Sequence, residues 1–198
     1  SLLLGTGAFG RAPYESVVCC GFTVDENGEK MSKSKGNGID PAEVTGKFGA
    51  DVLRLWVAST DYSVDVSIGD TILQRTSDAY RRFRNTFRFL LGSLSDFDDS
   101  KDAVDVADMP AIDVWALLRL RQVLADVEKG YDEYRFHQVF RTLYEYVIND
   151  LSAIYMDVAK DRLYSDAPDS VARRSAQTVL MSILEVMVRV MSPILSFT

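Results

Sequence analysis

Residues 68–94 read IGDTILQRTSDAYRRFRNTFRFLLGSL. Apolar side chains recur here at steps of three, four and seven, which places them on one face of an α-helix. They are Ile68, Ile72, Ala79, Tyr80, Phe83, Phe87, Leu90 and Leu94. The arginines fall mostly on the other faces, so this stretch predicts a long amphipathic helix whose apolar face packs against neighbouring helices.

Three further helices follow from the same helical period. The first spans residues 110–128, and we expect Gly130 to end it. The second places apolar residues on one face: Phe136, Phe140, Leu143, Val147, Leu151, Ile154 and Val158. The third begins at residues 167–170 and is closed by Pro193. Long amphipathic helices joined by short links pack as an antiparallel bundle, so the fold class is mainly α.

Two other stretches differ from this helical pattern. The acidic residues of 95–108 predict a mobile loop between the first two helices. Residues 1–66 mix short apolar runs with turn signals and predict a small α/β part. In that part, residues 16–24 favour one or two strands and residues 25–28 a turn. Asp40 and Pro41 start one helix, and residues 50–58 form the next.

Composition limits the function classes. The formal net charge of −7 argues weakly against a nucleic-acid binder, but arginines cluster on the first long helix. The two cysteines are adjacent and the chain has one histidine, so we expect no metal site. No apolar run is long enough to span a membrane.

Residues 28–37 read GEKMSKSKGN and place three lysines within six positions. Serine and glycine separate the lysines, so the backbone is flexible and rich in hydrogen-bond donors that can meet the oxygens of a triphosphate. Lysines aimed at a departing pyrophosphate would stabilise the transition state more than the ground state. A solvated lysine-rich hairpin tip is the competing interpretation of these residues.

Residues 30–34 match, letter for letter, the KMSKS signature of class I aminoacyl-tRNA synthetases, which this chain resembles. The flanking residues 49–58, 84–92 and 134–137 resemble the isoleucyl-tRNA synthetases in particular. The resemblance covers nearly the whole chain. Lys35 and Gly38 depart from it, because apolar residues are common at both positions.

The resemblance implies a fold and a set of roles. Residues 1–66 would be the C-terminal part of a Rossmann catalytic domain that holds the KMSKS loop. Residues 67–198 would be an α-helical anticodon-binding domain truncated at its C-terminus. The parent enzyme, a cytoplasmic and monomeric ligase of protein biosynthesis, would activate isoleucine with ATP and Mg²⁺ and join it to tRNA(Ile). Zinc is possible in the parent, but this chain offers no site for it.

The resemblance also assigns site residues. Lys30 and Lys33 would contact the ATP phosphates as catalytic groups, within an ATP loop of Lys30, Met31, Ser32, Lys33 and Ser34. The candidate tRNA contacts are the arginines Arg81, Arg82, Arg84, Arg88, Arg135, Arg141, Arg173 and Arg174. For any one of these arginines, a solvated helix face is an equally good interpretation.

Two alternatives stay open at this point. A valyl-tRNA synthetase would share the KMSKS loop and differ only in its amino acid. A non-catalytic tRNA-binding helical module would need the helices alone. Because the HIGH tetrapeptide that also binds ATP is absent, we expect the chain alone to have no aminoacylation activity.

Overall fold

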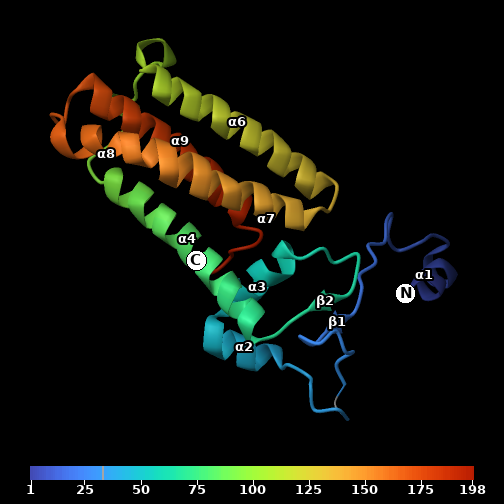
Figure 1. Cartoon of the computed structure of the whole chain (residues 1–198). Helices are drawn as coiled ribbons and strands as arrows, with labels where there is room; N and C mark the ends of the chain where they lie inside the picture. The colour runs from blue at the N-terminus through green and yellow to red at the C-terminus, as the bar shows by residue number, and fades with distance from the viewer. Residues whose placement is uncertain (33) are drawn as a thin grey trace.

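Four long helical segments pack side by side in the computed structural model, which describes residues 1–32 and 34–198 (Figure 1). The first is α4 (Asp70–Ser93) and the second is α6 (Ala111–Asp132). The third joins α7 (Phe136–Glu145), the π-helix η2 (Tyr146–Tyr155) and α8 (Met156–Ser165), and the fourth is α9 (Val171–Met191). Successive segments run in alternate directions, which confirms the predicted antiparallel bundle.

The third segment corrects the predicted helix face. Ile154 and Val158 were expected on the apolar face, yet they are 42% and 48% exposed. Their places are taken by Tyr155 and Ala159, both fully buried. A π-helix fits more residues into each turn than an α-helix does, so η2 moves the buried face by one residue.

Gly130 lies inside α6 rather than at its end, which makes the predicted helix end wrong. A Cβ atom on Gly130 would come within 2.7 Å of Val139 Cγ2, so the glycine allows close packing of α7. The chain instead leaves the helix through Tyr134, whose φ of 57° is left-handed.

The acidic stretch is attached to α9 and is not the mobile loop that its composition predicted. It contains α5 (Asp99–Asp102) and the short 3₁₀-helix η1 (Val106–Asp108). Gln177 Nε2 donates to Asp96 Oδ1 at 2.8 Å, and the Val104 amide donates to Thr178 Oγ1 at 3.1 Å. These contacts arise only because α9 folds back onto the stretch.

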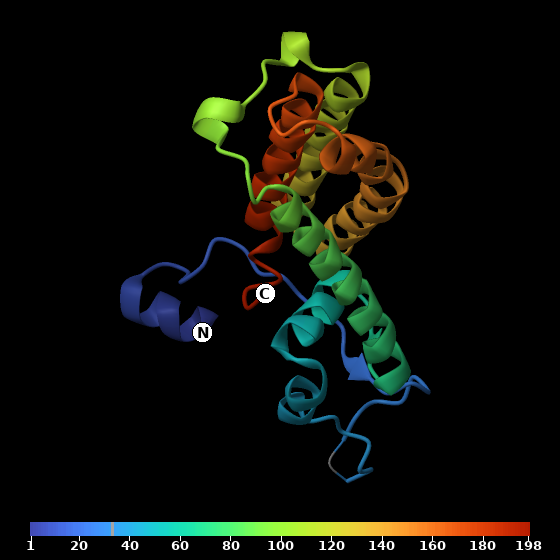
Figure 2. The ribbon, with the colours of Figure 1, turned by 90° about the vertical axis from the view of Figure 1, so that its left-hand side faces the viewer.

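The N-terminal part contains α1 (Leu2–Phe9), β1 (Thr23–Val24), α2 (Pro41–Phe48), α3 (Ala50–Ser59) and β2 (Val66–Ser67). The two strands pair in parallel, with Thr23 opposite Val66. The strands predicted over residues 16–24 are therefore reduced to two residues. Val17 and Val18 are exposed, and α1 stands apart from the rest of the molecule (Figure 2).

Helix α3 joins the two parts. It packs against α4 and α7, and Arg54 donates to the backbone oxygens of Ile194 (2.8 Å) and Pro193 (2.6 Å). Asp40 caps α2 through the Ala42 amide at 2.8 Å, as predicted. A small second core of Val44, Trp56, Ile68 and Leu73 lies where α2, α3 and the start of α4 meet. The predicted domain boundary falls inside β2 and stays a prediction.

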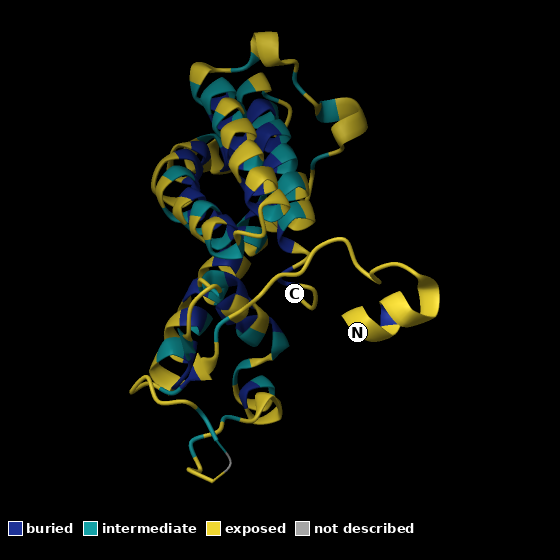
Figure 3. Ribbon diagram, turned by 90° about the vertical axis from the view of Figure 1, so that its right-hand side faces the viewer, coloured by how far each residue is buried: buried dark blue, intermediate teal, exposed yellow. Residues whose placement is uncertain are grey.

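Buried positions gather along the bundle helices, whereas the N-terminal helix and the loops are exposed (Figure 3). None of the helices that the structure describes combines the length and hydropathy needed to cross a membrane.

Candidate functional site

The KMSKS segment follows a tight hairpin that begins at β1. Val24 and Lys30 form an antiparallel bridge, and the Gly28 amide donates to the backbone oxygen of Asp25 at 3.0 Å. Gly28 has a φ of 79°, a conformation that favours glycine. The predicted turn at residues 25–28 is therefore confirmed, and it places residues 30–32 directly after the turn.

Asp25 and Asn37 connect the hairpin turn to the residues that follow the KMSKS segment. Asn37 Nδ2 donates to Asp25 Oδ2 at 2.9 Å, and Asn37 Oδ1 accepts from the Ser32 amide at 2.9 Å. The other Asp25 oxygen accepts from the amides of Asn27 (3.0 Å) and Glu29 (2.9 Å). The hydrogen bonds from Asn37 and from the Glu29 amide lower the pKa of Asp25. We call Asp25 and Asn37 the hairpin clamp.

The predicted ATP-loop residues lie in different environments. The Lys30 ammonium is exposed and lies 4.2 Å from the centre of the Phe22 ring. Met31 is half-buried and packs against the second core, so it anchors the loop to that core. Ser32 Oγ and Ser34 Oγ lie 3.3 Å apart. Lys33 lies outside the described residues.

The Lys35 side chain forms an ion pair with the hairpin. Its Nζ lies 2.9 Å from Glu29 Oε2, and both side chains are more than half exposed. The hydrogen bond and charge of Glu29 raise the pKa of Lys35. An exposed pair of this kind contributes little stability. It does give Lys35 a defined partner at the edge of the loop.

The hairpin turn also contacts the start of α4. Glu26 Oε1 accepts from the Thr71 amide at 3.2 Å, in the first turn of that helix. A Cβ atom on Gly69 would overlap the Glu26 side chain, so glycine lets the turn approach the helix. A carboxylate at a helix N-terminus is favourable because the amides there lack partners. The hairpin is thus tied to the first long helix of the bundle.

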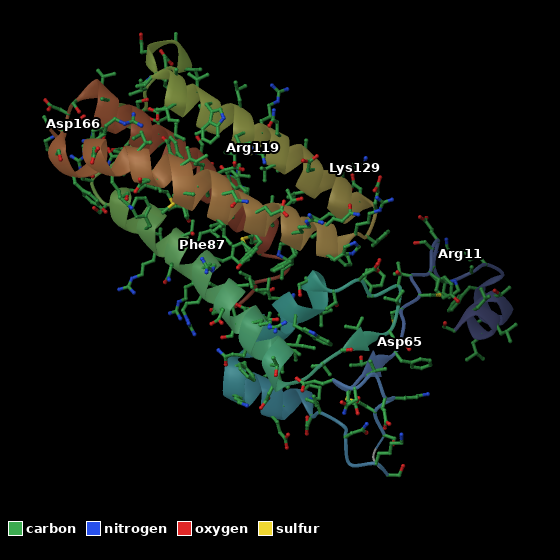
Figure 4. The ribbon with its side chains drawn as sticks, in the orientation of Figure 1. Arg11, Asp65, Phe87, Arg119, Lys129 and Asp166 are labelled. Carbon is green, nitrogen blue, oxygen red and sulfur yellow. The ribbon has the colours of Figure 1, made fainter. Side chains whose placement is uncertain are left out.

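Four of the predicted tRNA-contacting arginines lie on exposed positions of α4: Arg81, Arg82, Arg84 and Arg88. Nitrogen-tipped side chains project from α4 on the side away from α7, in the neighbourhood of Phe87 (Figure 4). Arg81, Arg84 and Arg88 line an open groove of about 980 Å³ between α4 and the end of α9. Arg81 also pairs with Asp78 at 3.2 Å.

The other four predicted arginines lie elsewhere. Arg135 pairs with Glu133 at 3.2 Å and Arg141 with Glu145 at 2.9 Å, and both are exposed. The Arg173 and Arg174 side chains are only 15% exposed and pair with Asp96 at 2.9 and 3.6 Å. The fold therefore uses the last two to hold the acidic stretch against α9.

Sequence reasoning missed the roles of Asp25, Glu26 and Glu29. Asp25 could have been suspected, because aspartate before a turn often accepts from amides two residues on. The contact of Glu26 with α4 had no local signal, since 45 residues separate the partners. No cluster of three or more His, Cys, Asp or Glu side chains suited to a metal occurs among residues 1–32 and 34–198.

Two family models match the chain. Residues 1–69 match the model for class I tRNA synthetases (I, L, M and V), and residues 113–198 match that for the anticodon-binding domain of tRNA ligases. The isoleucine–tRNA ligase of Desulfitobacterium hafniense (strain Y51) is 50% identical over all 198 residues, which cover 22% of that protein. The isoleucine–tRNA ligase of Moorella thermoacetica is 52% identical over the same length, 21% of that protein. The chain thus spans about a fifth of the length of these relatives.

Solved structures share the fold at lower identity. A Mycobacterium tuberculosis methionyl-tRNA synthetase bound to methionyl-adenylate matches 90% of this chain and 35% of its own, with a TM-score of 0.71 and 19% identity. A ternary complex of Agrobacterium radiobacter K84 LeuRS with tRNA and LeuAMS matches 89% of this chain and 20% of its own. Its TM-score is 0.65 and its identity 22%.

Proposed function

The chain belongs to the class I tRNA synthetases, and we propose that it supplies the ATP loop and a tRNA-contacting surface to a longer isoleucine–tRNA ligase. Such an enzyme forms isoleucyl-adenylate from isoleucine and ATP, releases pyrophosphate, and transfers the isoleucyl group to tRNA(Ile). One observation carries the proposal: the KMSKS hairpin is tied through Glu26 to the helix that holds the exposed arginines. The identity with isoleucine–tRNA ligases along the whole chain supports the choice of amino acid.

Lys30 and Lys33 have the electrostatic role in the first step. Negative charge grows on the pyrophosphate as the isoleucine carboxylate attacks the α-phosphorus, and ammonium groups aimed at that charge lower the barrier. The exposure of Lys30 supports this role, because its ammonium can reach a ligand. Ser32 and Ser34 would add hydroxyl donors, and Met31 would hold the loop against its core. Mg²⁺ would arrive bound to the ATP phosphates.

The exposed α4 arginines would contact the tRNA backbone. Phosphate contacts provide most of the affinity and little of the sequence choice. Arg81, Arg84 and Arg88 line one groove together with apolar side chains such as Leu91, Val188 and Met191, and would place three cations along a phosphate chain. Arg82, Arg135 and Arg141 would be outer contacts. Arg173 and Arg174 would not contact the tRNA, because their ion pairs face Asp96. The longer enzyme would be cytoplasmic and monomeric.

The first test uses the full-length protein that contains this chain. Lys30→Ala and Lys33→Ala should each lower the rate of isoleucine-dependent ATP–pyrophosphate exchange by about 100-fold, the typical loss of one such contact. Lys160→Ala is the control, because that lysine pairs with Asp157 on α8, within the helical bundle. Rates within twofold of the wild type for both loop variants would refute the catalytic assignment.

The second test titrates the 198-residue chain with isoleucine tRNA, valine tRNA and an anticodon-swapped pair at two salt concentrations. We expect binding that follows the isoleucine anticodon and weakens with salt. Arg84→Ala and Arg88→Ala should each reduce the salt slope by about one. Equal binding to all four tRNAs would place anticodon choice outside this chain. An unchanged slope would refute the α4 contacts.

A further inference from the structure

We propose that the hairpin clamp, Asp25 with Asn37, is a positioning element that sets the KMSKS backbone for adenylate formation. The inference rests on the proposed function, since it concerns the same loop. Asp25 stands five residues before Lys30 and Asn37 three residues after Ser34. Neither residue needs to touch ATP. Their effect would pass through the backbone that holds the lysines.

The geometry of the clamp fixes the start of the loop. The carboxylate of Asp25 uses one oxygen for two hairpin amides and the other for Asn37 Nδ2. The Asn37 amide is thereby oriented, because its nitrogen faces Asp25 and its oxygen faces Ser32. The Ser32 amide is held at 2.9 Å by this oxygen. The backbone of Ser32 therefore has a defined place relative to the hairpin, and its Oγ also accepts from the Lys35 amide at 3.3 Å.

Burial provides little of this order. The Lys30 and Ser34 side chains on either side of Ser32 are exposed, and Met31 alone of the described loop residues packs against a core. A flexible, glycine-flanked segment would otherwise sample many conformations, and each would have to be excluded when the transition state forms. Holding the loop in one arrangement removes that entropy before the reaction begins.

The hydrogen bond in the hairpin clamp has one donor, Asn37, and one acceptor, Asp25. Exchanging the two residues therefore tests the clamp. In Asp25→Asn, the new amide nitrogen faces the amide nitrogen of Asn37, so the bond to Asn37 is lost unless Asn37 turns away from Ser32. In Asn37→Asp, two carboxylates face each other. In the double variant D25N/N37D, the amide introduced by D25N can still accept from the hairpin amides and can donate to the carboxylate introduced by N37D. That carboxylate can still accept from Ser32. The two bonds seen at 2.9 Å would be re-formed, the one between positions 25 and 37 with its direction reversed and the one from the Ser32 amide with its direction unchanged.

The experiment measures ATP–pyrophosphate exchange by the full-length protein as a function of ATP concentration. Each single variant should lower kcat by about 10-fold to 100-fold, the range expected when a reacting group is slightly misplaced. The KM for ATP should change far less, because ground-state binding does not depend on the final arrangement of the loop. The double variant should recover most of the lost kcat. Asp98→Asn is the matched control, since Asp98 accepts from Ser100 and Lys101 in a similar exposed turn far from the loop.

Thermal unfolding of all variants, measured in parallel, separates positioning from folding. The inference is overturned if the single variants keep kcat within twofold of the wild type, or if the double variant is no better than the worse single variant. It is also overturned if kcat falls only in step with the melting temperature. Lys30→Ala and Lys33→Ala in the same assay separate the two proposals. Inactive lysine variants with active clamp variants refute the clamp alone, whereas active lysine variants refute the function on which it rests.

Discussion

Asp25 in the hairpin and Asp113 in the bundle are both surrounded by hydrogen-bond donors, but the two regions differ in what those bonds accomplish. Asp113 has no exposed side-chain surface and accepts from Arg162 through two bonds of 2.7 Å. Tyr155 and Ser175 complete its shell. Asp25 has a similar set of partners in an exposed hairpin. In the bundle, the loss of a hydrogen bond would leave the buried Asp113 carboxylate without one of its partners. In the hairpin, water can replace a lost partner.

Because of this difference in burial, the two regions should respond to substitution in different ways. Unsatisfied charge in a buried site is costly, so variants of the Asp113 network should unfold the bundle. Variants of the hairpin should leave stability almost unchanged and alter the orientation of the loop. This division can be tested at several positions, beginning where the loss of stability should be greatest.

Arg162→Met should give the largest loss. The variant leaves the Asp113 carboxylate buried without its cation, and breaking a buried pair in this way typically costs about 3–5 kcal/mol. The free energy of unfolding, measured in urea on the 198-residue chain, checks this. Arg189→Met removes an exposed pair with Glu185, whose side chains are 73% and 54% exposed, and should leave the urea midpoint unchanged. Equal effects of the two variants would contradict the proposed difference between buried and exposed pairs.

Gly130→Ala should destabilise the bundle by about 1–3 kcal/mol, the usual cost of overpacking. The added methyl group would lie 2.7 Å from Val139 Cγ2, and a β-branched side chain in a packed core cannot easily move away. Gly92→Ala is the matched control, because Gly92 also lies in a long helix but nothing lies within 4 Å of its added Cβ. Alanine there should stabilise by about 0.5–1 kcal/mol. Urea unfolding of both variants decides the sign.

The acid sensitivity of the bundle should depend on Asp113. Burial raises the pKa of Asp113, but the bonds from Arg162, Ser175 and Tyr155 outweigh burial and leave the pKa below its ordinary value. The unfolded chain therefore binds a proton more readily than the folded one. Stability from this group is present above about pH 4 and is lost as the pH falls through the folded pKa.

Urea midpoints between about pH 3 and pH 6 test this dependence in the wild type and in Asp113→Asn. We expect a shallower fall with acidification in the variant. Asp25, Asp61, Asp96 and Asp98 also have lowered pKa values and account for the slope that remains. Parallel pH profiles would show that Asp113 does not contribute.

The smallest effect is expected in the hairpin. Lys35→Ala removes the exposed pair with Glu29, and Asp25→Asn weakens the clamp, yet neither should move the urea midpoint of the chain beyond error. Hydrogen exchange of the Ser32 amide should nevertheless become faster in Asp25→Asn, because its acceptor Asn37 is no longer held. Unchanged exchange, or a global loss of stability, would contradict the division between the regions.

Much of the fold could be predicted because its signals are local. The period of three and four indicated four amphipathic segments, and Asp40 with Pro41 marked a helix start that the structure confirms. The failures came where distant residues decide. The predicted face through Ile154 and Val158 was wrong because η2 changes the helical period where Tyr155 bonds to Asp113. At the site, the KMSKS motif could be identified in the sequence, but the contact of Glu26 with α4 could not be predicted from it.

The helical period, the turn before the KMSKS segment and the family resemblance could all be read from the sequence alone. The helical period and the turn depend on neighbours within about one or two helical turns, so the chain specifies them locally. The resemblance depends only on the identity of residues along the chain. Only the folded chain decided which arginines face solvent, which are held by Asp96, and how the hairpin meets α4. Charges and hydrogen bonds act over a few ångströms in space. Partners 45 positions apart, such as Glu26 and Thr71, therefore become neighbours only when the bundle has formed.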